Sequence, residues 1–399
     1  MTAIYTPIKL QIGIDVGSLN HSVAISDNFG NIIKEFEITH TQKGFDTFFE
    51  IIEKEAKKLD ATISIAMEGY NGWARPLDSQ ILKRGYKLYN VNNIKLARFK
   101  EIFPASAKTD AIDARKIVEL FSLEKHLTVA KKVLQEIKPS DDVNAKLKKL
   151  TRRRRQLVNE KVAISNRFSS DLQAVAPDLK AITKSIDNLW FLRFITLRDD
   201  IRNLARVKKS SILGIKYLGA KTLSIIQEWQ KGATFSDELE YTACMIYDDA
   251  MRLLELKGKI KELTKQIEIL NSDSKIATKL QTIPGFSTIS AGELAGEIGT
   301  LKRFKNENSL ALYLGMTNLD NSSGKQKGSK RNLSTNRHAK NAMITATMKH
   351  VMYTDESKKY LNKKISEGKR YQQAIRSIGR HLVRVIWSMI QNDRNYEIR

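Results

Sequence analysis

The sequence predicts an α/β domain at the N-terminus followed by a mostly helical remainder. Up to about residue 125, short apolar runs typical of strands alternate with stretches of helical periodicity. From residue 140 onward, apolar residues recur at helical spacing instead. The chain has 399 residues, of which 41% are hydrophobic, so it is long enough for two or three domains with their own cores.

The N-terminal elements are predicted in a definite order. Strands are expected at 9–16, 21–27, 31–38, 62–68 and 86–91, and helices at 42–58, 73–84, 92–101 and 110–123. Asp27-Asn28-Phe29-Gly30 is the expected turn of the hairpin that joins the second and third strands. Three meandering strands followed by alternating helix and strand is the order of an RNase H-like domain, with five strands and helices on the faces of the sheet.

The middle of the chain, residues 140–275, is expected to consist of long amphipathic helices. The apolar positions that line their faces are Leu147, Leu150, Leu157, Val158 and Ile164, and then Met251, Leu254, Leu256, Ile260, Leu263, Ile267 and Leu270. This spacing predicts a coiled coil, either antiparallel within the chain or between chains. Either arrangement is compatible with an oligomer.

Residues 276–399 form a third, mainly helical segment. It opens with Leu280-Gln281-Thr282-Ile283-Pro284-Gly285-Phe286 and continues with Ser290-Ala291-Gly292-Glu293-Leu294-Ala295. A helix, a tight turn containing glycine and a second helix are typical of a helix-hairpin-helix, which can offer backbone N–H groups to a DNA phosphate. An ordinary helical hairpin gives the same pattern.

Four acidic residues are candidate metal ligands. Asp15 and Glu68 end two apolar runs, which the predicted strand order places on neighbouring strands, and Asp110 and Asp113 share one face of a helix. Carboxylate oxygens suit Mg²⁺, with Mn²⁺ as the alternative, and two such ions support in-line attack on a phosphodiester. Each acid also has a plain interpretation, as a turn former or as a first-turn residue favoured by the helix dipole.

The charge of the chain indicates a polyanionic partner. Lys and Arg number 68 against 44 Asp and Glu, a formal net charge of +24. The densest basic tract lies on a predicted helix and consists of Lys146, Lys148, Lys149, Arg152, Arg153, Arg154 and Arg155. These side chains spread around the helix, so they either grip phosphates on a wide front or form a solvated charged face, and the net charge favours phosphates.

A polar, basic loop over Asp320–Gly328 contains two serines, Ser322 and Ser323. It is interpreted either as a loop that contacts phosphates, with Lys325 and Lys327 as the cations, or as the carrier of a nucleophilic serine. A serine hydroxyl is a weak nucleophile until a base or a metal activates it.

The compartment follows from what the sequence lacks. One cysteine, Cys244, excludes a disulfide framework and a cysteine-based zinc site. No apolar run reaches the length of a membrane span and the N-terminus lacks a signal-peptide pattern, so an intracellular protein without a membrane partner is expected.

Taken together, these features resemble the DEDD transposases of bacterial insertion sequences, a family that includes bridge-RNA-guided recombinases and related invertases. The RuvC-like, RNase H-fold half of that family is similar to residues 1–125, through Ile12–Asp15, Glu68 and Lys108–Ala114. Its C-terminal transposase domain is similar to residues 276–399. The matching segments there are Ile283–Gly285 through Phe304, Leu312–Met316, Ser323-Gly324, Gly368–Arg370, Ala374-Ile375 and Leu382-Val383.

The resemblance implies a DNA transposase or recombinase, acting in the bacterial cytoplasm at the nucleoid. It implies that Asp15, Glu68, Asp110 and Asp113 hold Mg²⁺ beside a nucleophilic serine. The serine of the family precedes a glycine, which favours Ser323, although Ser322 is adjacent. The implied partners are donor and target DNA, a bridge RNA and further copies of the chain, as a dimer to tetramer with residues 140–275 as an assembly region.

Two other functions use the same residues differently. A structure-specific endonuclease of the Holliday-junction type would use the carboxylates and a metal-activated water, with no role for Ser323. A non-catalytic nucleic-acid-binding protein would need neither the carboxylates nor the serine.

Overall fold

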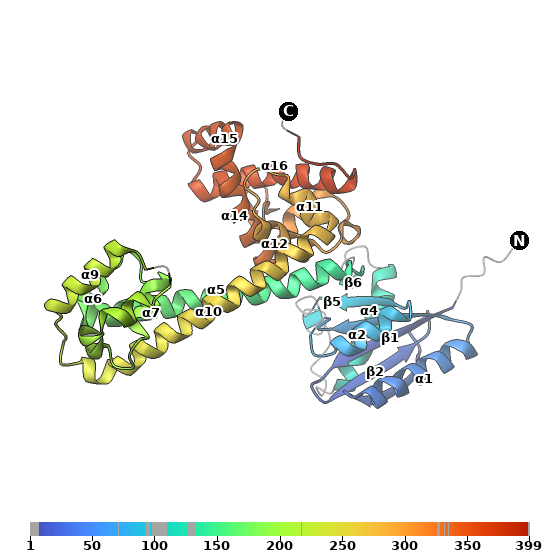
Figure 1. The fold of residues 1–399 in the computed structure, drawn as a ribbon. Coiled ribbons are helices and arrows are strands. Elements are labelled where there is room, and N and C mark those ends of the chain that lie inside the picture. The colour runs from blue at the N-terminus through green and yellow to red at the C-terminus, as the bar shows by residue number, and fades with distance from the viewer. Residues whose placement is uncertain are drawn as a thin grey trace, which may run out of the picture. The chain divides into compact units, whose positions relative to one another are not determined.

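The computed structural model separates into two compact units, residues 1–139 and 140–399 (Figure 1). The residues that the structure describes are 8–70, 72–92, 96–97, 110–126, 133–216, 218–324, 328–330, 332–333 and 335–397. Each unit has its own hydrophobic clusters and is described by itself.

The first unit is built on a mixed sheet with the strand order β3-β2-β1-β4-β5-β6. The strands are β1 Lys9–Val16, β2 Asn20–Ser26, β3 Ile32–Thr39, β4 Thr62–Glu68, β5 Lys87–Val91 and β6 Leu134–Glu136. β2 pairs antiparallel with both β1 and β3, β4 pairs parallel with β1 and β5, and β6 is antiparallel to β5. The mixed α/β architecture and all five expected strands are therefore confirmed.

The hairpin between β2 and β3 turns at the predicted residues. One carboxylate oxygen of Asp27 accepts hydrogen bonds from the backbone N–H of Phe29 at 2.8 Å and of Asn31 at 3.0 Å. Gly30 adopts a φ of 89°, which glycine tolerates without a steric penalty. The side chain of Asp27 thus replaces the missing backbone partners of the turn.

Helices cover both faces of this sheet. α1 (Gln42–Lys58) and α2 (Arg75–Lys83) pack on one face, over a cluster that includes Ile12, Phe48 and Ile65. α4 (Asp110–His126) packs on the other face, where small residues of the sheet, among them Ala24 and Ala66, allow close approach. The carboxyl ends of β1 and β4 therefore lie on a sheet with both faces covered.

The sequence-based prediction of the sheet needs one correction. The sheet has six strands rather than five, because β6 pairs with β5 and extends the first unit beyond residue 125 to residue 139. β6 is three residues long with Leu134 as its one buried side chain, which is too short for a periodic signal. The helix expected at 92–101 lies outside the described residues except for 92, 96 and 97, of which 96 and 97 are helical.

Two long helices dominate the second unit. α5 (Asp142–Val175) and α10 (Leu239–Asp273) run antiparallel in the same chain (Figure 1). Their polar contacts fix the direction. Arg154 donates to Thr264 at 2.9 Å, whereas Arg167, which lies later on α5, pairs with Asp249, which lies earlier on α10. Of the two coiled-coil arrangements expected, the structure has the antiparallel pair within one chain.

One apolar position of the predicted coiled-coil faces is wrong. Met251 is 46% exposed, whereas Leu253 and Leu256 are fully buried. The stretch 250–256 is apolar on more than one side, so the spacing alone does not single out the buried face.

A helical lobe connects the two long helices. It contains α6 (Pro177–Ala181), α7 (Leu189–Ile195), the 3₁₀ helix η2 (Ile201–Arg206), α8 (Lys209–Leu213) and α9 (Ala220–Lys231). Phe168, Phe191 and Phe194 are completely buried in its core. This core is separate from the cluster of the C-terminal helices, and the boundary expected at 275/276 falls inside the second unit.

The C-terminal segment is mainly helical, as expected. Its elements are α11 (Lys275–Gln281), α12 (Thr288–Ile298), η3 (Leu301–Arg303), α13 (Glu307–Tyr313), α14 (Arg337–Tyr353), α15 (Asp355–Ser366) and α16 (Tyr371–Gln391). A two-stranded hairpin, β7 (Leu319–Asp320) and β8 (Ser329–Lys330), interrupts the helices. Within the described residues, no helix combines the length and apolar character that crossing a membrane requires.

The packing of α4 on β1 gives a first prediction. A Cβ atom at Gly13 would lie 2.4 Å from the carbonyl oxygen of Ala114 and 2.9 Å from Val118. We expect Gly13→Ala to lower the free energy of unfolding of the first unit by about 1–3 kcal/mol, as overpacking does, measured by urea denaturation of the full chain.

Gly258 is the matched control, because a Cβ atom there meets nothing within 4 Å. Gly258→Ala should leave stability unchanged or raise it by up to about 1 kcal/mol, the helix preference of alanine over glycine. Equal stability of Gly13→Ala and the unaltered chain would contradict the close approach of α4.

Candidate active site

Asp15 and Glu68 lie at the carboxyl ends of two adjacent parallel strands, β1 and β4. The last paired residues of β1 and β4 are Ile14 and Met67, and Asp15 and Glu68 are the next residue of each strand. Both side chains are half-buried. Because parallel strands in register point equivalent residues to the same face, the two carboxylates lie side by side.

The face on which they lie is the one that α4 covers. Gly13, two residues before Asp15, is in close contact with Ala114 of α4, and Ala66, two residues before Glu68, packs with Ile117. Side chains two apart on a strand share a face. Asp15 and Glu68 therefore lie on the face of the sheet against which α4 packs.

Asp110 and Asp113 form the first turn of α4. Asp110 is exposed, whereas Asp113 is 8% exposed and has the amino group of Lys116 4.0 Å from its Oδ1 atom. Negative charge at the start of a helix is favoured by the helix dipole. The structure thus places the second carboxylate pair on the helix that covers the first.

The donor set has the right chemistry for a hard divalent cation, since all four groups are carboxylates. The positions of the four carboxylates, however, do not complete a metal site. Among the described residues, the structure contains no group of three or more Asp, Glu, His or Cys side chains assembled for metal binding. It brings Asp15 and Glu68 together and sets Asp110 and Asp113 on the facing helix, without joining the two pairs into one ligand group.

The candidate serines lie at the tip of the β7–β8 hairpin. Leu319 pairs with Lys330, and the N–H of Asn321 donates to the carbonyl of Gly328 at 2.9 Å, so the pairing of the two strands extends to Asn321 and Gly328. Ser322 and Ser323 are both exposed, and Gly324 adopts a φ of 56°. Lys325 and Lys327, the expected cations of this loop, lie outside the described residues.

The predicted basic tract divides into two groups. Lys146, Lys149 and Arg153 are exposed on α5, as a phosphate-binding surface requires. Lys148, Arg152, Arg154 and Arg155 are half-buried and contact other helices of the second unit. Neither of the two readings, a wide phosphate grip or a solvated face, describes this second group.

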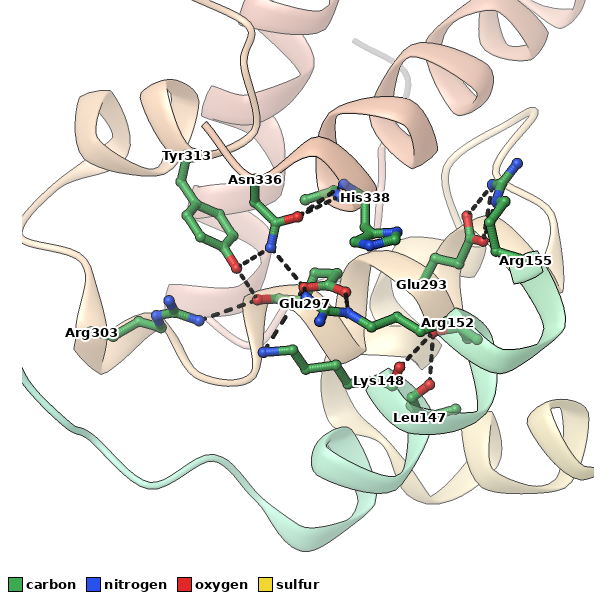
Figure 2. Close-up of polar contacts among 12 residues, drawn as sticks. Leu147, Lys148, Arg152, Arg155, Glu293, Glu297, Arg303, Tyr313, Asn336 and His338 are labelled. Atoms are coloured by element: carbon green, nitrogen blue, oxygen red, sulfur yellow. Dashed lines mark hydrogen bonds and ion pairs between the residues drawn. The ribbon is translucent and has the colours of Figure 1, made fainter. Parts of the chain in front are cut away.

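Two buried glutamates of α12 are the partners of Arg152 and Arg155 (Figure 2). Arg152 donates from Nε and Nη2 to the two carboxylate oxygens of Glu297 at 2.6 and 2.9 Å. Arg155 donates to Glu293 at 2.8 and 2.9 Å. Arginine and carboxylate bind in this two-pronged way with high geometric specificity, so the two pairs set the register between α5 and α12.

Glu297 joins more elements than Glu293 does. The Nδ2 atom of Asn336 donates to Glu297 Oε2 at 2.7 Å, and the hydroxyl of Tyr313 donates to the Glu297 carbonyl at 3.0 Å (Figure 2). Arg303 donates to the same carbonyl at 3.2 Å. Helices α5, α12, α13 and α14 therefore meet at this one residue.

The electrostatics of Glu297 follow from these partners. Burial by itself raises the pKa of its carboxyl, since only 1% of the side chain is exposed. The hydrogen bond from Arg152, the charges of Lys148 and Arg152, and the hydrogen bond from Asn336 outweigh burial and hold that pKa below its ordinary value of 4.5. The carboxylate is thus stabilised in its charged form.

Sequence reasoning missed this network. The signal was present, because Glu293 and Glu297 stand four apart in a helix otherwise composed of apolar and small residues. Arg152 and Arg155 are three apart, which is the complementary spacing. Nothing in the sequence tells that α5 and α12 pack together.

The expected pair of helices is present as α11 and α12, with the turn at Gly285 between them, an arrangement that both interpretations of the sequence share. A Cβ atom at Gly285 would lie 2.4 Å from the backbone nitrogen of His350, and the His350 ring hydrogen-bonds the Pro284 carbonyl at 2.8 Å. The glycine therefore permits close packing of the turn on α14. A phosphate contact at this turn stays a prediction.

Two family models match the chain. One, described as Transposase and named DEDD_Tnp_IS110, matches residues 12–177, which include all four carboxylates. The other, described as Transposase IS116/IS110/IS902 family, matches residues 277–362, which include the serine hairpin and Glu297.

Full-length relatives carry the same similarity. The chain is 21% identical over 406 residues to the 44.8 kDa protein of insertion element IS116 from Streptomyces clavuligerus, over 97% of this chain and 96% of the relative. It is 22% identical over 396 residues to the 42 kDa protein of IS900 from Mycobacterium paratuberculosis, over 96% of each. It is also 22% identical over 396 residues to the 43.6 kDa protein of IS110 from Streptomyces coelicolor, over 97% and 95%.

The lowered pKa of Glu297 predicts an acid-sensitive contribution to stability. Because the pKa is lower in the folded state, the contribution is present above pH 4.5 and is lost as the pH falls towards the folded pKa. We expect Glu297→Gln to cost about 1–3 kcal/mol of unfolding free energy at pH 7, as the loss of a buried charged hydrogen-bond partner does.

The measurement is urea denaturation of the unaltered chain and of Glu297→Gln at several pH values between neutral and strongly acidic. The stability difference between the two proteins should shrink as the pH falls below 4.5. A difference that stays constant over this range would show that the charge of Glu297 is not what stabilises the contact.

Proposed function

We propose that the chain is a transposase of the IS110/IS116 insertion-sequence family, and that it is a DNA recombinase that cuts and rejoins DNA through a serine; the two family models and the similar insertion-element proteins support this. The observation that carries the proposal is the exposed tip of the β7–β8 hairpin, where Ser322 and Ser323 stand beside Gly324. Because both serines are exposed, a DNA backbone can approach their hydroxyl groups. Ser323 is the preferred nucleophile, since it directly precedes the glycine.

The first unit is proposed to have an RNase H-like, RuvC-like fold. In support, its strand order 3-2-1-4-5 combines three antiparallel strands with two parallel ones, and helices cover both faces. Asp15 and Glu68 then stand at the ends of the two central strands. A catalytic role for these two carboxylates agrees with their position, because strands hold their side chains rigidly.

Asp15, Glu68, Asp110 and Asp113 are proposed to bind Mg²⁺, or Mn²⁺ in its place. When bound, the metal supplies electrophilic stabilisation of the scissile phosphate. Asp15 and Glu68 contribute two adjacent oxygen donors from rigid strands. Asp113, at 8% exposure, is a buried carboxylate on the helix that covers them, and Asp110 precedes it by one turn.

The proposed chemical step is a transesterification. The Oγ atom of Ser323 attacks the phosphorus, the bond between phosphorus and the 3′ oxygen breaks, and the serine proton leaves while the 3′ oxygen gains one. The products are a phosphoserine linked to DNA and a free 3′ hydroxyl. The number of phosphoester bonds is unchanged, so the reverse reaction with a different 3′ hydroxyl rejoins strands without ATP. Lys325 and Lys327 would neutralise charge in the transition state.

The proposed partners are donor and target DNA, a bridge RNA and further copies of the chain, from a dimer to a tetramer. A net charge of +24 supports binding to nucleic acid. Of the basic tract, the exposed cations Lys146, Lys149 and Arg153 are the proposed phosphate contacts. The bridge RNA and the oligomer rest on the family resemblance.

A covalent-adduct assay tests the proposed nucleophile. The full chain is incubated with the RNA from its own locus, element-end and target DNA, and Mg²⁺, then denatured and examined for DNA attached to protein. We expect an adduct in the unaltered protein and a loss of at least about 100-fold in Ser323→Ala, because no other hydroxyl replaces a positioned nucleophile. Asp15→Asn and Glu68→Gln should reduce the adduct as strongly.

Ser322→Ala is the matched control, one residue away in the same exposed turn. An adduct that persists in Ser323→Ala and disappears in Ser322→Ala would move the nucleophile by one residue. Cleaved DNA without an adduct in any of the proteins would replace the proposal with a structure-specific endonuclease that uses water.

The division of the basic tract predicts a selective salt effect. We expect Lys149→Ala to weaken DNA binding and to reduce the slope of log affinity against log salt by roughly 0.9, the value for one lost phosphate contact. Lys231, 73% exposed on α9, is the control, and Lys231→Ala should leave the slope unchanged. Filter binding at several salt concentrations measures both. Equal slopes for Lys149→Ala and the unaltered chain would remove α5 from the DNA interface.

A further inference from the structure

Residues 314–335, the serine segment, carry Ser322 and Ser323. Tyr313 directly before the segment and Asn336 directly after it form its base and are hydrogen-bonded to each other. The N–H of Asn336 donates to the Tyr313 carbonyl at 2.9 Å, and Asn336 Nδ2 lies 2.5 Å from the Tyr313 hydroxyl (Figure 2). Thr335 adds a hydrogen bond to the Leu312 carbonyl at 3.2 Å. The last residue of α13 and the N-cap of α14 therefore hold both ends of the segment together.

Both base residues are tied to the same glutamate. Asn336 donates to the Glu297 carboxylate, and Tyr313 donates to the Glu297 carbonyl. The ring of Tyr313 is held from a second side, because the Arg303 guanidinium lies 4.7 Å from its centroid. The orientation of the serine segment at its base is thus set by contacts with α12.

Glu297 is in turn held by α5. Its two carboxylate oxygens accept from Arg152, and Lys148 stands 4.0 Å away, one helical turn earlier. The side chain is almost completely buried, so it has few alternative positions. A continuous chain of hydrogen bonds leads from Arg152 through Glu297 to both ends of the serine segment.

From this geometry we propose that Glu297 is a positioning residue, which acts through Tyr313 and Asn336 to hold the serine hairpin in a reactive orientation. The proposal rests on the serine chemistry proposed above. The proposal gives Arg152, a member of the predicted phosphate-binding tract, a part in the same positioning network, because it holds the Glu297 carboxylate. Glu297 itself touches neither serine, so its effect on reaction is indirect.

The fold contains a close comparison. Glu293 is on the same helix, one turn before Glu297, and forms the same kind of ion pair with an arginine of α5. Among the contacts described for the two residues, those to Tyr313 and Asn336 belong to Glu297. If the ion pairs served only to join α5 to α12, loss of either would have the same consequences.

Asn336→Asp is the most selective test. The Oδ1 atom of Asn336 accepts from the N–H groups of His338 and Ala339, and aspartate keeps this cap of α14. The substitution replaces the Nδ2 donor with an oxygen that repels the Glu297 carboxylate. The double variant E297Q/N336D restores a donor and an acceptor between these two positions in the reverse direction, while Arg152 keeps one acceptor oxygen at position 297 in place of two. Tyr313→Phe, which removes one hydroxyl, is a milder second variant.

Two readouts are made on the full chain. Backbone amide exchange over residues 314–335 reports the order of the serine segment without nucleic acid. The single-turnover rate of adduct formation, together with DNA affinity, reports reactivity. We expect Asn336→Asp to speed amide exchange and to slow adduct formation by about 10- to 100-fold at unchanged DNA affinity, since small misplacements of a reacting group have effects of this size. Tyr313→Phe should change both readouts in the same direction by less.

The double variant should recover exchange and adduct rate towards the values of the unaltered chain, and Glu293→Gln should change neither. Recovery of stability without recovery of either readout would overturn the positioning role, as would equal effects of Glu293→Gln and Asn336→Asp. If the unaltered protein forms no adduct, the serine chemistry is wrong. The exchange results then still decide whether Glu297 holds the segment.

Discussion

A single buried carboxylate organises the C-terminal half of this protein. Glu297 lies on α12 with 1% of its side chain exposed, and groups from α5, α13 and α14 converge on it. A buried charge is costly unless it is paired and hydrogen-bonded, and here the pairing is made by residues from distant parts of the sequence. The cost of leaving the charge unpaired therefore specifies how these helices pack together.

The first unit depends on a different constraint, the close approach of α4 to the sheet. Gly13 and Ala66 provide room for Ala114 and Ile117 because their side chains are absent or small. The same alternation that turns these small residues towards α4 turns Asp15 and Glu68 to that face as well. Packing of the core and placement of the carboxylates thus follow from one strand register.

Much of the fold was accessible from the sequence because its elements carry strong periodic signals. The five expected strands, the turn at Asp27 and the long helices α5 and α10 are present. β6 escaped prediction, since it is three residues long and exists through its pairing with β5. Met251 was assigned to a buried face on spacing alone, and the structure exposes it.

The candidate site was accessible only in part. The sequence determined which residues are candidates for chemistry: carboxylates at strand ends, two serines in a basic loop and an excess of positive charge. The tertiary structure decided their surroundings. It set Asp15 beside Glu68 through the register of β1 and β4, and it paired the half-buried Arg152 and Arg155 with the buried Glu297 and Glu293. Strand and helix signals are local, whereas ion pairs join residues about 140 positions apart, so only the folded chain reveals which charges face solvent and which face each other.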